Sequence, residues 1–416
     1  MKQLARALKT RLPKKHRNGT HRSVAPDETV RRLMPLMSRF GITRVANVTG
    51  LDWLGIPVVM VCRPNSRSLS VSQGKGLTLD AAKASGLMES IELFYAERIT
   101  LPVKVGSFHE MWKHHNVVDV EQLPCLNRLR YHAHHELLWV EGYDLLNDQP
   151  TWAPYESVST NSVSLNRPGQ GCFELSSNGL ASGNELLEAI IHAICEVIER
   201  DATTLWRYRK TQPRKASRVD LDSCDDLNCR KLIARCRESG LQILVWETTS
   251  DIGLPSFLCL LHEDSRNPSR LPYASEGMGC HVSRTIALLR AITEAAQCRL
   301  TFITGSRDDM FRDQYQQSHL GSDYLPRYYA LQPLNGKYRN FKRIPSFDSE
   351  TFNEDLELIV ERLRAAGLKQ VIVVALTEAE SPFQVVKVLI PGLEGYDAYP
   401  LYSPGFRAQR LRNDPL

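Results

Sequence analysis

Apolar residues recur every three or four positions in several parts of the chain, as they do on one face of an α-helix. Near the N-terminal end this spacing predicts a helix over residues 28–40, which Pro35 is expected to kink and Gly41 to end. The same spacing predicts helices over residues 284–301 and 352–366. Helices are therefore expected in both halves of the chain.

Runs rich in β-branched and aromatic residues stand between these helices and predict strands. The predicted strands cover residues 43–48, 56–62, 241–247, 256–262, 370–376 and 384–389. Because strands and helices both occur along the whole chain, the fold class is predicted to be α+β.

The chain divides by composition into three parts. Residues 1–22 carry eight Lys and Arg side chains and no Asp or Glu, which predicts a basic flexible arm. Residues 23–400 are expected to form one main domain, followed by a tail over residues 401–416. Inside the domain, a proline-rich stretch at 101–169 is predicted to be an insertion or lid, and a polar stretch at 305–340 a surface loop.

Length and composition limit the class of protein. With 416 residues and 42% hydrophobic content, the chain can bury a substantial core. Its apolar runs are far shorter than the roughly 20 residues of a membrane-spanning helix, so no membrane partner is expected. Ten cysteines occur without a CxxC pair, and no apolar signal segment follows Met1, which predicts a cytoplasmic location.

The net charge of +5 is concentrated in the basic arm. Such an arm can attract an acidic peptide or an anionic surface, or it can serve only solubility, and the sequence leaves both interpretations open. No aromatic residues alternate with the basic ones, so nucleic acid is not expected as a partner.

Three helical segments become comparable when each is aligned on one glutamate: Glu89, Glu196 or Glu294. Three residues after these anchors stand Glu92, Glu199 and Gln297. Small residues occupy the positions seven and three before the anchors: Ala82 and Gly86, Ala189 and Ala193, and Ala287 and Ala291. On an α-helix these positions lie on the side of the anchor, so the small residues permit close approach while the carboxylates converge on one cleft.

Carboxylates within one helical turn repel each other and are costly to bury, so their repetition predicts a hard divalent cation. Magnesium takes one or two carboxylates per ion and bridges phosphates, so several ions around a polyphosphate are expected. The predicted ligands are Glu89, Glu92, Glu188, Glu196, Glu199 and Glu294. Three solvated helix faces are the simpler alternative.

Phosphate contacts are predicted near the second acidic helix. Residues 176–184 form a small, flexible loop before this helix, as in sites where backbone N–H groups bind phosphate. Asn184 either contacts the nucleotide or only caps the helix. Arg200 and Arg290 lie close to the acids in sequence and are expected to neutralise phosphate oxygens.

Together these segments resemble the YcaO family. The resemblance rests on Gln73–Gly76, Ala81–Glu92, Ser177–Asn184 and Glu188–Ala202, and on Arg290 standing four residues before Glu294. It implies a YcaO-type fold with mixed sheets, in which the three acidic helices converge on a cleft for ATP and Mg²⁺. It also implies that Arg22 and Thr29 contact the nucleotide and that the protein is a homodimer.

The activity implied by the resemblance is ATP-dependent phosphorylation of a backbone amide oxygen in a precursor peptide or protein, without a covalent nucleophile from the enzyme. Residues 19–22, 44–51 and 60–67 look like those of members that work with a TfuA-type partner, which favours thioamide formation with sulfur supplied by that partner. An azoline-forming cyclodehydratase is the alternative, weakened because Arg412–Leu416 is not a proline-rich tail. A non-catalytic nucleotide-binding scaffold is a second alternative.

Overall fold

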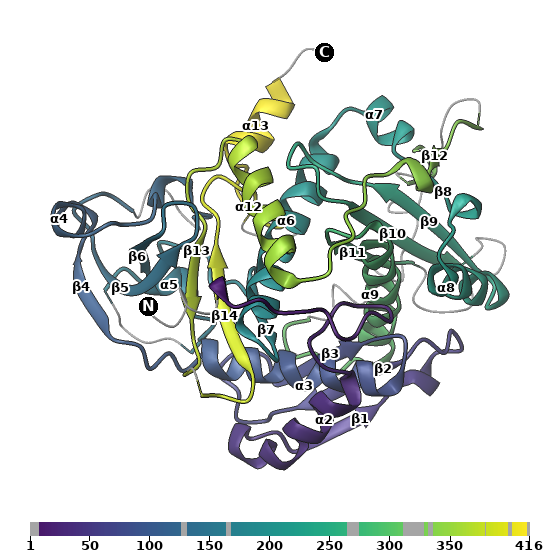
Figure 1. The fold of residues 1–416 in the computed structure, drawn as a ribbon, viewed down its shortest axis with the longest axis horizontal. Coiled ribbons are helices and arrows are strands. Elements are labelled where there is room, and N and C mark those ends of the chain that lie inside the picture. Colours follow the sequence, from purple (N-terminus) through teal and green to yellow (C-terminus); the bar gives the residue numbers. More distant parts are fainter. Residues whose placement is uncertain are drawn as a thin grey trace.

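A computed structural model of the chain shows a mixed α and β architecture built on several sheets (Figure 1). The structure describes residues 8–125, 131–163, 168–263, 274–310, 328–331, 336–378, 380–397 and 402–413. Two three-stranded sheets and one six-stranded sheet are antiparallel, and a short parallel pair completes the set. The predicted α+β class is confirmed.

The strands fall into four groups. The first sheet has the order β1-β2-β3, and its strands are β1 Arg44–Asn47, β2 Val58–Cys62 and β3 Val71–Lys75. The six-stranded sheet has the order β4-β5-β13-β14-β7 with β6 added on β5, and its strands are β4 Val103–Ser107, β5 Glu136–Asp144, β6 Gln149–Pro154, β7 Leu180–Gly183, β13 Ile372–Ala375 and β14 Gln384–Leu389. The third sheet contains β9 Leu241–Glu247, β10 Ser256–Glu263 and β11 Ala274–Cys280, and the parallel pair is β8 Val219–Asp220 with β12 Arg339–Asn340.

Helices pack against these sheets and cover their buried faces (Figure 1). They are α2 Pro26–Leu33, α3 Leu79–Ala96, α4 Phe108–His114, α5 Tyr155–Val158, α6 Leu186–Tyr208, α7 Thr211–Ala216, α8 Leu227–Glu238, α9 Arg284–Thr304, α12 Phe352–Ala365 and α13 Phe406–Asn413. None of the helices in the described part of the chain is both long and apolar enough to span a membrane.

Most of the predicted elements are confirmed, and β9 and β14 begin and end at the predicted residues. The N-terminal helix is shorter than predicted, because α2 ends at Leu33 and two 3₁₀ turns continue to Phe40. Pro35 lies in the first turn, where its missing N–H ends the regular helix. Gly41 follows with a φ of 67°, a left-handed conformation that glycine adopts without strain.

The proline-rich stretch at 101–169 is part of the largest sheet in this structure. It supplies β4, β5 and β6, and β5 pairs with β13 through Asp144 and Ile372. Trp139 and Val140 are fully buried in the main hydrophobic core. The same stretch also contains α4, a helix that was not among the predicted elements. Its role as an insertion or lid stays a prediction.

The predicted flexible arm is corrected for residues 8–22, which lie against the body of the protein. Pro13 forms an isolated bridge with Thr351, and the buried Lys14 side chain pairs with Asp355. Charge counting along the sequence could not reveal this partner, because it lies more than three hundred residues away. Residues 1–7 lie outside the described residues, as does most of the predicted surface loop at 305–340.

Two strands beside the candidate site were not predicted. The segment 176–184, predicted as a flexible loop, contains β7, whose residues are all buried and which pairs with β14. β11 is also new, and its glycines and small residues carry no strand signal in the sequence. The predicted tail includes α13, which packs on α6.

Each acidic helix packs directly on one strand, as the small residues predicted. α3 lies on β3, α6 on β7 and α9 on β11 (Figure 1). All six small residues are buried: Ala82 and Gly86 on α3, Ala189 and Ala193 on α6, and Ala287 and Ala291 on α9. Glycines on the facing strands complete the contact, since a Cβ at Gly279 would stand 2.0 Å from the backbone oxygen of Ala287. Helix and strand backbones therefore touch.

Replacing Gly279 with alanine is expected to destabilise the fold by about 1–3 kcal/mol, because the added methyl group has no space between β11 and α9. Thermal and urea unfolding would measure the change. Gly50→Ala is the matched control, since no atom lies within 4 Å of a Cβ built at Gly50. Equal stability of the two variants would contradict the close helix–strand contact.

Candidate functional site

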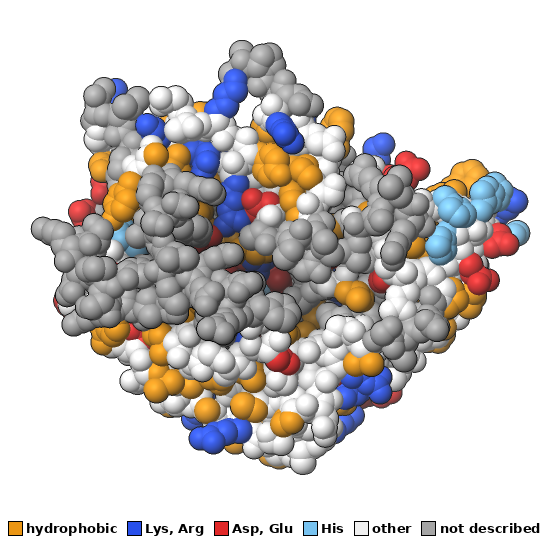
Figure 2. Space-filling model, turned by 180° about the vertical axis from the view of Figure 1, so that it is seen from behind, with side chains coloured by type: hydrophobic (Ala, Val, Ile, Leu, Met, Phe, Trp, Pro, Cys, Tyr) orange, Lys and Arg blue, Asp and Glu red, His pale blue; other side chains and the backbone are white. Residues whose placement is uncertain are grey.

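A cleft of about 1870 Å³ lies between the three acidic helices and the N-terminal segment. On the face drawn in Figure 2, acidic and basic side chains meet in a hollow near the centre of the surface. Ten of the eleven predicted site residues line the cleft: Arg22, Thr29, Glu89, Glu92, Asn184, Glu196, Glu199, Arg200, Arg290 and Glu294. The structure thus brings together residues that are spread over more than 270 positions.

The acids of α3 are half-buried and partly neutralised. Burial raises the pKa of Glu89 to about 7, although Arg307 and Lys75 oppose the shift. Burial also raises the pKa of Glu92 well above its usual value, and the neighbouring Glu89 raises it further. The hydroxyl of Ser182, on β7, donates a hydrogen bond to Glu92 at 2.5 Å. These carboxyls therefore lie where a cation would stabilise the charged form.

The acids of α6 have the same character. Burial raises the pKa of Glu196 to about 7, and Arg200 opposes this shift. Glu196 is half-buried, whereas Glu199 is buried. Both burial and the charge of Glu294 raise the pKa of Glu199. The backbone N–H of Cys280 donates to Glu199 Oε2 at 2.9 Å, which fixes one carboxylate oxygen against β11.

Glu294 on α9 differs from the other acids because a lysine neutralises it. Its carboxylate forms an ion pair with Lys75 of β3. Burial raises the pKa of Glu294, but Lys75 and Arg200 outweigh burial and hold the pKa below its usual value. Gln297 donates from Nε2 to the backbone oxygen of Gln73 at 2.8 Å, so this amide joins α9 to β3.

Four arginines line the cleft: Arg22, Arg200, Arg290 and Arg307. Arg200 Nη2 lies 4.0 Å from Glu196 Oε1, and its Cζ lies 5.0 Å from the ring centre of Tyr396. Arg290 Nη1 lies 2.8 Å from His192 Nε2. Burial and the charge of Arg290 lower the pKa of His192 well below its usual value, so His192 is neutral and accepts this hydrogen bond. A neutral acceptor orients the Arg290 guanidinium without cancelling its charge.

Two further predicted nucleotide contacts lie beside each other. Thr29 Oγ1 donates to Asn184 Oδ1 at 3.1 Å, which joins α2 to the segment before α6. The N-cap of α6 is Glu185, so the structure does not use Asn184 as the cap residue. Arg22 lies near Glu188 and Glu92, and burial together with Arg290 lowers its pKa.

Glu188 is the one predicted ligand that does not line the cleft. Its side chain is 1% exposed and closes the capping box of α6, accepting from the backbone N–H of Asn184 at 2.7 Å and of Glu185 at 3.2 Å. It also accepts from the backbone N–H of Ser23. These three donors satisfy the carboxylate, and its role as a magnesium ligand stays a prediction.

Four residues that were not predicted also line the cleft: Lys75, Ser182, His192 and Arg307. Lys75 lies in the segment Gln73–Gly76, which contributed to the family resemblance, but no role was predicted for the lysine itself. Ser182 and His192 also line the cleft, and neither residue type marks a site by itself. Arg307 follows α9 and lies near Glu89, which only the folded chain reveals.

The donor set fits magnesium bound together with phosphates. Among the described residues, no three His, Cys, Asp or Glu side chains lie close enough to hold a metal ion by themselves. Magnesium, however, is usually held by one or two carboxylates, with waters and phosphate oxygens completing its shell. Four carboxylates with raised pKa values line the cleft, of which Glu199 is buried and the other three are half-buried. A divalent cation would offset their desolvation and their mutual repulsion.

Comparisons with known proteins agree with the geometry. A family model described as "YcaO cyclodehydratase, ATP-ad Mg2+-binding" matches residues 73–394. An uncharacterised protein in the tfuA 3' region of Rhizobium leguminosarum bv. trifolii is 35% identical over 384 residues, which cover 90% of this chain and 88% of that protein.

Solved structures show the same fold. YcaO from Methanopyrus kandleri, bound with AMPPCP and Mg²⁺, has a TM-score of 0.71 and 22% identity, covering 92% of this chain and 95% of that one. A heterocyclase in complex with substrate and cofactor has a TM-score of 0.76 and 23% identity. It covers 93% of this chain, but this chain spans only 54% of the heterocyclase.

The family match defines a class of proteins that use ATP and Mg²⁺, which confirms the predicted cofactors. Within this class, the chain belongs to the YcaO family. The predicted YcaO-type fold is confirmed as well.

Proposed function

We propose that the protein phosphorylates a backbone amide oxygen of a precursor peptide or protein, and that the activated amide is converted to a thioamide. The observation that carries this proposal is the convergence of four carboxylates with raised pKa values and four arginines on one cleft. Phosphoryl transfer needs chiefly positioning and charge neutralisation, and this set of residues offers both.

The residues divide into two roles. Glu89, Glu92, Glu196 and Glu199 would hold magnesium, which supplies charge neutralisation to the phosphates when bound. Arg200 and Arg290 would bind phosphate oxygens, while Arg22 and the linked Thr29–Asn184 pair would hold the rest of the nucleotide.

The reaction balances without an oxidant. The amide oxygen bonds to the γ-phosphorus as ADP leaves, and sulfide then adds to the carbonyl carbon. Loss of phosphate carries the former amide oxygen away and leaves a C=S bond. No covalent nucleophile from the enzyme is required.

The choice of thioamide formation is supported by the relative in the tfuA 3' region. It agrees with the resemblance to members that work with a TfuA-type partner, which would supply the sulfur. Azoline formation by attack of a neighbouring Cys, Ser or Thr side chain is the second candidate, supported by the cyclodehydratase description of the family. A homodimer is part of the same proposal.

Mass spectrometry would distinguish these products. With ATP, Mg²⁺, sulfide, the partner protein and its peptide, we expect a gain of about 16 Da, because sulfur replaces oxygen. A loss of about 18 Da would show azoline formation instead, because water is removed. A reaction with EDTA in place of Mg²⁺ is the control and should leave the peptide mass unchanged. Nucleotide binding without any turnover would favour the scaffold alternative.

A further inference from the structure

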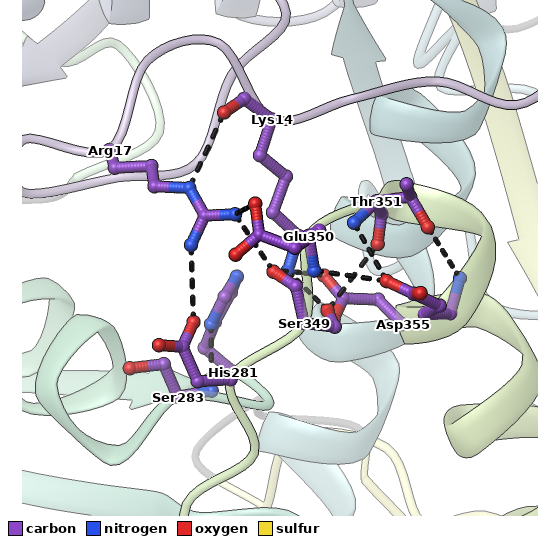
Figure 3. Close-up of polar contacts among 10 residues, drawn as sticks. Lys14, Arg17, His281, Ser283, Ser349, Glu350, Thr351 and Asp355 are labelled. Atoms are coloured by element: carbon purple, nitrogen blue, oxygen red, sulfur yellow. Dashed lines mark hydrogen bonds and ion pairs between the residues drawn. The ribbon is translucent and has the colours of Figure 1, made fainter.

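A buried lysine anchors the N-terminal segment, residues 8–22, to the segment 349–355 (Figure 3). Lys14 Nζ lies 2.7 Å from Asp355 Oδ2, and the two side chains are 0% and 1% exposed. The same ammonium donates to the hydroxyl of Ser349 at 2.6 Å and to the Ser349 backbone oxygen at 3.1 Å. The buried ammonium of Lys14 thus has an ion-pair partner and two hydrogen-bond acceptors on the segment 349–355.

Backbone contacts on both sides of Lys14 reinforce this anchor. The backbone N–H of Lys14 donates to the oxygen of Glu350 at 3.1 Å. Leu12 accepts from the N–H of Phe352 at 2.9 Å and donates to Asn353 Oδ1 at 2.8 Å. The segment is thus held on the N-terminal end of α12 by a continuous set of hydrogen bonds.

A short loop connects the anchor to Arg22. His16 and Arg22 exchange two backbone hydrogen bonds of 2.9 Å, so the chain folds back on itself between them. Gly19, with a φ of 73°, makes the turn, and a Cβ there would overlap Leu77. After the turn, the His21 ring packs edge-on against His281 with 5.2 Å between ring centres.

Arg22 is consequently held from two sides. On one side its backbone is fixed by His16, which follows the Lys14 anchor; on the other side the N–H of the next residue, Ser23, donates to the buried Glu188. Arg22 lines the cleft between these two attachments.

We propose that Lys14 is a positioning residue for the nucleotide: its ion pair with Asp355 docks residues 8–22 so that Arg22 is held in the cleft. This inference rests on the proposed nucleotide contact of Arg22. Binding of ATP and docking of the segment are then coupled, and each favours the other to the same extent.

Nucleotide affinity of the full-length protein tests this coupling. Lys14→Met is expected to weaken binding of Mg²⁺–ATP by about 10-fold, since a segment docked one-tenth of the time lowers apparent affinity by that factor. At saturating ATP, kcat should change much less, because the nucleotide redocks the segment. Lys15→Met is the matched control, as Lys15 is the exposed neighbour, and it should bind like wild type.

A second variant separates positioning from stability, because Lys14→Met alone leaves Asp355 buried without its cation. Lys14→Met combined with Asp355→Leu removes both charges and should restore the melting temperature but not the nucleotide affinity. Hydrogen exchange of residues 8–22 should be faster in both variants and slower in wild type with ATP.

Wild-type affinity in both variants, or unchanged exchange of residues 8–22, would overturn the positioning role. These measurements need no peptide substrate, so their failure is distinct from failure of the proposed reaction. If the wild-type protein modifies its peptide as proposed but the Lys14 variants bind ATP with wild-type affinity, only the inference about Lys14 is refuted.

Discussion

Replacing Glu199 with glutamine is expected to lower peptide-dependent ATP turnover by about 100-fold or more, the scale seen when one preorganised charge contact to a phosphoryl-transfer site is lost. Glutamine has the shape of glutamate and can still accept the N–H of Cys280, so the fold should survive. What disappears is the negative charge, which lies near Glu294 and would hold magnesium. Phosphate release measured with saturating peptide would report the loss.

Glu357→Gln is the control for this variant. Glu357 is exposed on α12 and is not among the residues that line the cleft. Its replacement by glutamine should therefore leave turnover unchanged. Circular dichroism and melting temperature should match wild type in both variants. If Glu199→Gln retains wild-type turnover, the catalytic role of the acidic cleft fails and a nucleotide-binding scaffold becomes the better description.

Loss of Arg299 is expected to cause the largest fall in stability, about 3–5 kcal/mol, because it leaves a carboxylate buried without its cation. Arg299 Nε lies 2.9 Å from Asp52 Oδ2, and the two side chains are 0% and 1% exposed. The pair joins α9 to the turn between β1 and β2. Thermal and urea unfolding of Arg299→Met would measure the effect.

Arg237→Met is the matched control, because Arg237 pairs with Asp222 where the side chains are 50% and 77% exposed. Such a pair contributes about 0–1 kcal/mol. Combining Arg299→Met with Asp52→Leu should recover part of the lost stability, since no charge then stays buried alone. Equal melting temperatures for Arg299→Met and Arg237→Met would disprove a special role for the buried pair.

The sequence predicted those helices and strands whose residue pattern is contained within the element itself. Runs rich in β-branched and aromatic residues located β9 and β14, and helical spacing located α9 and α12. β7 and β11 were not predicted as strands, because they consist largely of small residues. These small residues allow a helix to pack closely on the strand. A glycine such as Gly279 signals a loop in sequence but a close contact in the fold.

The site was predictable where its chemistry repeats along the chain. Three aligned acidic segments located the cleft, and the structure brings all three together. Residues that act through a distant partner could not be found this way: Lys75 reaches Glu294, and Lys14 reaches Asp355. Glu188 shows the converse, because its position suggested a ligand while its carboxylate is taken up by backbone N–H groups.

The three acidic helices belong to three different sheets, since β3, β7 and β11 each lie in a separate one. The cleft is therefore a joint where independent structural blocks meet. Because each helix backbone touches its strand with no layer of side chains between them, the backbone of each acidic residue is expected to move together with its strand. A nucleotide bound across the cleft would contact all three helices and so connect the three sheets. Nucleotide binding and the relative position of the sheets would then be thermodynamically linked.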